Sequence, residues 1–472
     1  MASGAALVVL ATQSSPVLAL GALVAVCLFA LLVRYPSVGL FITAAVIPLE
    51  RMGRLTEDAS AYTVSVMRVV GMLALAALVV HHLLNRLRFK VDLPLVLYAG
   101  YFGFAALTIA YTTDQSGTIR ACGAILANLL FFFLVTNLTQ TKRHADTAIM
   151  VWLAASVLAG IYTIYDWHIG SHDLASVDFG QVDPGRGEQE TGYRFTTIWE
   201  DRAEWETTSS VRRAMGPTSH SAVYGINLIL TLPFFAYLLR RARNGLARTL
   251  LTMGALIISY NLLLTNTRAA ILVGIGVMAL CVARGLLRPT IPQLAGAMVV
   301  GALLFFVIPS DIYARMLDLS SYTSDRSATL RIRLDYWAAG WRLIEDHWLT
   351  GVGVGNQNAV PEYAATIGPS RTTVHNEYIQ TALEVGVGGW LLFIGFVGVL
   401  LWYGVAASTM FRQRRDTQEE YWLMVACQIA MVGVLVYGLT VDVFHFPLKG
   451  WWLVAAITAV MYRTGRQLSA PG

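Results

Sequence analysis

Acid–base chemistry is suggested first by one histidine, His375, in the sequence His375-Asn376-Glu377-Tyr378 just before a long apolar run. An imidazole with an unperturbed pKa of about 6.5 is suited to take a proton from a hydroxyl group near neutral pH. A lone histidine at the start of a helix is also common as a purely structural residue. Position alone therefore leaves a catalytic and a structural role open for His375.

Anion binding is suggested by two arginine sites at the ends of other apolar runs. Arg212 and Arg213 precede the run that begins near residue 219, and Arg268 lies in the short polar turn 265–270 between two runs. Ionisable residues at a membrane edge are costly, and guanidinium groups bind phosphate through paired donors. The structural alternatives are a surface anchor for the first site and a plain polar turn for the second.

No cofactor or metal is expected from the remaining motifs. Gly351, Gly353 and Gly355 superficially resemble a phosphate-binding loop, but they follow no strand and lack both the G-x-G-x-x-G and the P-loop spacing. We interpret them as a glycine turn. The four cysteines all lie inside apolar runs and have no zinc-type spacing.

The composition is that of a protein embedded in lipid. Of the 472 residues, 56% are hydrophobic and 13% are charged, and the mean hydropathy is +0.58, whereas soluble domains carry about 25% charged residues. The net charge of +5 is spread in short clusters between apolar runs, so nucleic acid is not an expected partner. Because backbone groups in lipid must be paired internally, the sequence predicts an all-α integral membrane protein.

Thirteen apolar runs are candidates for crossing the bilayer, which takes about 20 residues in a helix. The second run is short enough to be a half-span, so the prediction is 12–13 transmembrane helices. The runs are 16–33, 37–50, 62–84, 93–111, 121–138, 147–167, 219–239, 249–264, 270–286, 292–308, 380–404, 421–440 and 450–462.

Lysine and arginine concentrate on one set of connecting segments, which is therefore predicted to be cytoplasmic. This set holds 17 of the 34 basic residues but only 5 of the 29 acidic ones. The C-terminus is then cytoplasmic, and thirteen spans would place the N-terminus outside. The two long loops, 168–218 and 309–379, face the other compartment together with Arg213, Arg268 and His375.

These boundaries divide the chain into five parts. In the second long loop, apolar residues recur at three- and four-residue steps, which predicts a surface helix over 329–347; they are Leu330, Leu334, Trp337, Trp341 and Ile344. The parts are N-terminal transmembrane helices 1–167, an outer loop 168–218, central helices 219–308, a large outer loop 309–379 with the surface helix and the histidine motif, and C-terminal helices with a cytoplasmic tail 380–472.

Four segments in this order resemble the O-antigen ligase and O-antigen polymerase superfamily. The stretch 331–356, which ends Asp346-His347-Trp348-Leu349-Thr350-Gly351-Val352-Gly353-Val354-Gly355-Asn356, is similar to that family's characteristic outer loop. So is His375-Asn376-Glu377-Tyr378 followed by Leu383-Glu384-Val385-Gly386 and Gly389. The segments 213–216 and 265–268 look like the other two landmarks, and the resemblance covers roughly 200–405.

The resemblance implies a GT-C-like bundle in the bacterial inner membrane, with two long periplasmic loops and an active site facing the periplasm. The implied reaction transfers a glycan from a polyprenyl (undecaprenyl) diphosphate to an acceptor hydroxyl without a metal. The acceptor is lipid A-core in the ligases of lipopolysaccharide biosynthesis, another lipid-linked glycan in O-antigen or exopolysaccharide polymerases, and a protein in related O-oligosaccharyltransferases. A single sequence does not distinguish these three acceptors, and we take the ligase reaction as the working hypothesis.

The resemblance also gives the candidate residues roles. His375 would take the acceptor proton, while Arg213 and Arg268 would stabilise the charge that develops on the diphosphate. Arg212 is an alternative to Arg213, which we favour because it keeps the Arg-x-x-Gly spacing to Gly216. Supporting residues that would orient the imidazole or guide the glycans are Asn376, Glu377, Tyr378, Glu384, Arg331 and Arg333.

Two other classes of function were weighed. A secondary transporter would have charged or broken helices near the bilayer midplane and repeated halves. Apart from Arg68 the predicted spans are mostly uncharged, and no internal repeat is visible. A structural or assembly protein of the membrane would need none of the proposed chemistry, and unchanged glycan transfer after His375→Ala would contradict the catalytic mechanism.

Overall fold

The computed structural model describes most of the helical part of the chain. The described residues are 16–49, 65–169, 213–218, 221–291, 295–296, 299, 329–355, 358, 374–445 and 448–469. The main helices are α2 (Pro16–Arg34), α3 (Pro36–Val46), α4 (Val66–Leu84), α5 (Leu93–Leu107), α6 (Gln115–Leu138), α7 (Lys142–His168), α8 (Ser221–Arg241), α9 (Gly245–Leu264), α10 (Arg268–Ala283), α13 (Thr329–Asp346), α15 (Glu377–Arg412), α16 (Gln418–Tyr437) and α17 (Lys449–Ser469).

The protein is an all-α integral membrane protein, as predicted. Eight helices of the described part are long and apolar enough to cross a bilayer, and α10 is a shorter apolar helix. The predicted half-span at 37–50 corresponds to a real break, because α2 and α3 meet at Pro36 with a bend of 119°. Counted as one span, this pair raises the number to nine. The run 292–308 falls largely outside the described residues, so the count of 12–13 stays a prediction.

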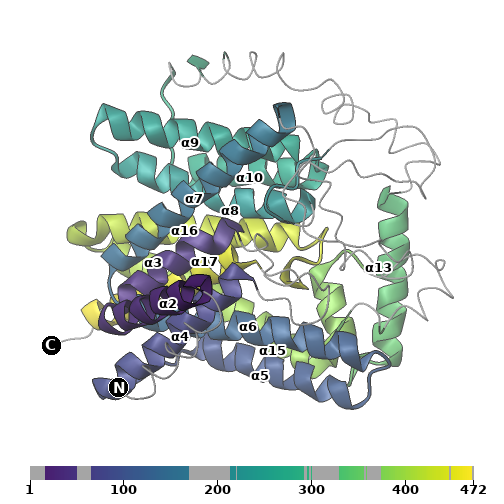
Figure 1. Ribbon diagram of the computed structural model, residues 1–472. Coiled ribbons are helices and arrows are strands. Elements are labelled where there is room, and N and C mark those ends of the chain that lie inside the picture. Colours follow the sequence, from purple (N-terminus) through teal and green to yellow (C-terminus); the bar gives the residue numbers. More distant parts are fainter. Residues whose placement is uncertain are drawn as a thin grey trace.

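The core of the bundle is built around α8, α16 and α17. In α8, 89% of the membrane-length window is buried, whereas α4 and α9 are only 28% buried and therefore face the lipid. Figure 1 shows α8, α16 and α17 between α9–α10 on one side and α5–α15 on the other. Trp451 and Trp452 of α17 are fully buried and pack against Phe396 of α15. The residues that lead into α8 and follow α16 are consequently held by the most rigid part of the molecule.

A buried polar contact fixes the end of α9. The amide of Asn261, which is fully buried, accepts a hydrogen bond from the Tyr224 hydroxyl of α8 at 3.0 Å and donates one to the Gly160 carbonyl of α7 at 3.1 Å. An unpaired amide in lipid would be costly, so these bonds favour a single alignment of the three helices. This alignment positions the turn that follows α9.

The predicted helix over 329–347 is present as α13, and two of the apolar residues that predicted it lie on its exposed side. Leu334 and Trp341 are 50% and 58% exposed, whereas Tyr336, Ala339 and Leu343 are buried. The small alanine allows α13 to approach α15 closely, where Leu343 joins a small hydrophobic cluster. In Figure 1, α13 runs across the direction of the bundle helices at one end. Leu334 and Trp341 are left on its outer face, whereas Trp337 and Ile344 pack against the cluster.

Candidate functional site

The turn between α9 and α10 holds Arg268 at the first position of α10. Thr265 and Asn266 are almost completely buried, and Asn266 has a positive φ of 48°. The Thr265 hydroxyl donates to the Leu262 carbonyl at 2.7 Å, which closes the last turn of α9. Both polar atoms of the Asn266 amide are buried without a hydrogen bond to any described residue. Since buried polar groups are normally hydrogen-bonded, Asn266 is a candidate for contact with a ligand.

Arg213 lies beside this turn. The backbone N–H of Ala214 donates to the Leu264 carbonyl at the end of α9, at 2.8 Å. The Arg-x-x-Gly spacing also has a structural cause, because Gly216 has a φ of 53° and an added Cβ would lie 2.5 Å from the Tyr224 ring. Only glycine fits there. Arg212, the alternative to Arg213, lies outside the described residues.

The histidine motif forms the start of α15. The Asn376 side chain caps this helix by accepting hydrogen bonds from the N–H groups of Tyr378 and Ile379, at 3.0 and 3.3 Å. His375 is exposed and has a φ of 54°, which is uncommon outside glycine. Its ring lies against the Tyr336 ring of α13, with centroids 6.2 Å apart. The cap and the neighbouring ring define where the imidazole lies.

Glu377 joins the start of α15 to the connection between α16 and α17. Its backbone N–H donates to the Gly438 carbonyl at 2.8 Å. Its buried carboxylate accepts hydrogen bonds from the N–H of Phe444, at 2.8 Å, and the hydroxyl of Thr381, at 3.0 Å. These are structural bonds. The prediction that Glu377 orients the imidazole stays a prediction.

Glu384 holds the glycine turn against α15. Its Oε1 accepts hydrogen bonds from the Gln380 amide at 2.7 Å and the Gly355 N–H at 3.3 Å. Its carbonyl accepts from the Gly353 N–H at 3.0 Å. Three glycines in this turn have positive φ, so the run forms a turn as predicted. It faces a kink in α15 at Gly386, where φ is 65°.

The separate segments meet around Tyr437, the last residue of α16. Its hydroxyl donates to the Ala222 carbonyl at 3.2 Å, and the charges of Arg213 and Arg333 both act on it electrostatically. The next residue, Gly438, accepts the hydrogen bond from Glu377. Arg213, Arg333 and the histidine motif thus adjoin the end of α16, although Arg213 and His375 are more than 100 residues apart in sequence.

Four of the predicted residues lie in segments that meet in this region. Arg213, Arg268, Arg333 and His375 belong to segments that are brought together, although their catalytic roles stay predictions. The Arg331 side chain lies outside the described residues. Within the segments that meet here, only the arginines and the histidine could be recognised from the sequence as candidates for chemistry.

Several residues of this region were missed. Tyr437 occurs in an apolar stretch, so its sequence context suggests a core residue, whereas Tyr336 lies among the charged residues of α13 and carries no signal of its own. Asp442 and Lys449 are buried polar residues near a membrane edge, and the rarity of such charges would have singled them out. Within the described residues, no group of three or more His, Cys, Asp or Glu side chains could hold a metal ion.

A family model described as O-antigen ligase matches residues 253–394, from α9 through the first half of α15. This segment includes Arg268, Arg333 and His375 but not Arg213. No curated protein matches the chain.

Proposed function

We propose that this protein is a membrane glycosyltransferase that transfers a glycan from a polyprenyl diphosphate to an acceptor hydroxyl, because residues 253–394 match a family model described as O-antigen ligase. The reaction would take place between the segments that hold Arg213, Arg268 and His375. We propose lipid A-core as the acceptor. The alternatives within the family are a second lipid-linked glycan and a protein hydroxyl.

The proposed reaction is a direct displacement at the anomeric carbon of the donor glycan. The acceptor oxygen forms the new glycosidic bond while His375 takes its proton. The bond between the anomeric carbon and the diphosphate breaks, and its electron pair leaves with the polyprenyl diphosphate. Arg213 and Arg268 stabilise the negative charge that grows on this leaving group, because fixed guanidinium groups act most strongly where charge develops.

The observation that best supports the proposal is the meeting of these segments around Tyr437. A diphosphate needs cations and an acceptor hydroxyl needs a base, and both must act on the same bond. The arginine sites adjoin the end of α9, and the histidine adjoins α13 and the connection after α16. The Asn266 amide, two residues before Arg268, is buried without a hydrogen bond to any described residue and offers further donor and acceptor groups.

We also propose that the site faces the periplasm of the bacterial inner membrane. The basis is the charge distribution, since the segments at the opposite ends of the helices hold 17 of the 34 basic residues but only 5 of the 29 acidic ones.

Purified full-length protein incubated with polyprenyl-diphosphate-linked glycan, with and without lipid A-core, would test this proposal. We expect a glycan-modified core, resolved on a gel, and release of polyprenyl diphosphate. A ladder of longer lipid-linked glycans without core would favour the polymerase alternative. Failure to transfer to lipid A-core, lipid-linked glycan or protein, by protein that remains folded and monodisperse, would overturn it.

A further inference from the structure

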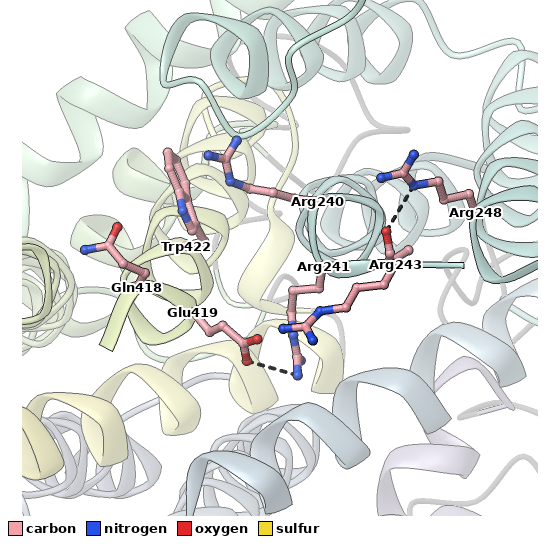
Figure 2. Close-up of a pocket in the computed structure, with 8 residues that line it drawn as sticks. Arg240, Arg241, Arg243, Arg248, Gln418, Glu419 and Trp422 are labelled. Atoms are coloured by element: carbon pink, nitrogen blue, oxygen red, sulfur yellow. Dashed lines mark hydrogen bonds and ion pairs between the residues drawn. The ribbon is translucent and has the colours of Figure 1, made fainter. Parts of the chain in front are cut away.

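A second charged site lies at the other end of α8 and α16. A pocket of about 430 Å³ is lined by four arginines, Arg240, Arg241, Arg243 and Arg248, together with Glu419, Gln418 and Trp422 (Figure 2). We propose that this pocket binds the phosphate headgroup of an anionic phospholipid. The proposal does not depend on the glycosyltransferase function, because α8 and α16 separate the pocket from the candidate site along their length.

The acidic groups near the pocket are already neutralised. Glu419 forms salt bridges with Lys142 at 2.5 Å and with Arg241 at 3.1 Å. The same two cations also contact Asp146, at 2.9 and 2.8 Å, and the Tyr237 hydroxyl donates to this carboxylate. Two cations thus balance two carboxylates. The charges of the other three lining arginines are left without a carboxylate in the pocket.

These three arginines line the cavity, and none of them forms an ion pair with a carboxylate of the described residues. Arg240 lies over the Trp422 ring at 3.7 Å and donates to the Gly285 carbonyl at 2.8 Å. Arg248 donates to the Ala242 carbonyl through Nε, at 3.0 Å, so its two terminal nitrogens remain available to a phosphate. Arg243 makes no hydrogen bond or ion pair with the part of the chain that the structure describes. Paired guanidinium donors match phosphate oxygens.

The surface beside the pocket favours a lipid over a free anion. Leu246, Leu250 and Met253 of α9 are 72%, 59% and 54% exposed, at spacings that place them along one side of the helix. This helix faces the lipid and also carries Arg248. A phospholipid with its phosphate at the arginines would lay its acyl chains along this apolar stripe, which inorganic phosphate would not contact. Basic pockets between transmembrane helices are suited to such headgroups.

The simpler explanation is that these arginines only anchor helix ends at an anionic membrane surface. That explanation predicts that removing any two arginines on this face weakens lipid binding equally. A specific site predicts that only the arginines of the pocket matter, and the chain offers a matched control. Arg86 and Arg88 are two exposed arginines on the same predicted face but outside the pocket.

The test compares full-length wild type, R243Q/R248Q and R86Q/R88Q by native mass spectrometry. Each protein is titrated with phosphatidylglycerol, phosphatidylcholine or inorganic phosphate. We expect wild type and R86Q/R88Q to retain phosphatidylglycerol, and R243Q/R248Q to bind it at least about fivefold more weakly than the control pair. Because R248Q also removes the bond to Ala242, Arg243→Gln is measured alone and should show part of the same loss.

Three outcomes would overturn the proposal. Equal weakening in both double variants would mean that only the charge of the surface matters. Equal binding of phosphatidylcholine would mean that the headgroup charge is not recognised. Binding of inorganic phosphate with the same arginine dependence, and no preference for the lipid, would assign the pocket to free anions.

Discussion

At the scale of single residues, the candidate site depends on groups held in unusual positions. His375 and Asn266 both have positive φ, a conformation that costs free energy in residues with a side chain. In both cases the neighbours are rigid: the capped start of α15 and the closed end of α9. Such strain tends to persist where it serves a function, which agrees with the proposed roles.

His375→Ala should abolish most transfer without affecting folding, because the exposed ring contributes little to the core. We expect kcat to fall by about 10²- to 10⁴-fold, the range for loss of a general base. Transfer is measured with the lipid-linked glycan assay. His347→Ala, in a histidine just after α13, serves as the matched control and should retain activity. Unchanged kcat in His375→Ala would remove the base from the mechanism.

Arg268→Gln should lower kcat by about 10²- to 10³-fold, because one fixed charge facing the developing diphosphate is lost. Arg268→Lys should recover only part of the activity, since an ammonium keeps the charge but lacks paired donors. Arg342→Gln removes an exposed arginine of α13 as the control. If Arg268→Gln changed neither kcat nor KM for the donor, Arg268 would be merely a helix-end residue.

At the scale of elements, the site is assembled by contacts between the loops and the broken start of α15. The glycine turn pairs with the backbone around Gly386, and Glu384 bonds to both sides of this junction. The start of α15 is also tied to the residues after α16 through Glu377. The position of His375 therefore depends on contacts of α15 with the glycine turn that follows α13 and with the residues that follow α16.

Gly386→Ala should destabilise this junction. With a φ of 65°, the new Cβ would lie 2.3 Å from the Leu349 carbonyl oxygen, and backbone atoms cannot move aside cheaply. We expect a loss of about 1–3 kcal/mol, seen as a lower unfolding temperature of the protein in detergent.

Gly398→Ala is the matched control in the same helix. No atom lies within 4 Å of its added Cβ, so stability should stay the same or rise by up to about 1 kcal/mol. Equal unfolding temperatures for the two variants would show that the close approach at Gly386 does not matter.

At the scale of the whole molecule, the two charged sites lie at opposite ends of the core helices. The candidate transferase site adjoins the start of α8 and the end of α16, whereas the arginine pocket adjoins the end of α8 and the start of α16. A lipid-linked donor and a structural phospholipid would thus occupy different leaflets. The orientation is a prediction from the charges.

Cysteine labelling should test that orientation. In a Cys27→Ser background, which removes an exposed native cysteine, Glu345→Cys on α13 and Arg412→Cys at the end of α15 are each introduced. We expect a membrane-impermeant maleimide added to intact spheroplasts to label position 345 but not 412. Labelling of position 412 alone in intact spheroplasts would reverse the predicted topology. Labelling of both positions only after permeabilisation would place both in the cytoplasm and contradict it.

The sequence by itself determined the membrane class, the all-α fold, the short second run at 37–50 and the helix over 329–347, because hydropathy and helical periodicity are local properties. It also singled out Arg213, Arg268 and His375, since charges are rare at a membrane edge and few residue types can act as bases. Gly216 was recognised only as part of a spacing, and its need to be glycine became clear from the Tyr224 ring beside it.

Tertiary structure decided what the local pattern leaves open. The buried face of α13 includes Tyr336, Ala339 and Leu343, while Trp341 lies outside, because α15 covers only one side of this helix. Tyr437 looks like a core residue in sequence, yet it lies where the arginine and histidine segments meet. The arginine pocket also depends on which cations Glu419 and Asp146 neutralise. Such pairings join residues far apart in the chain, and local sequence contains no signal for them.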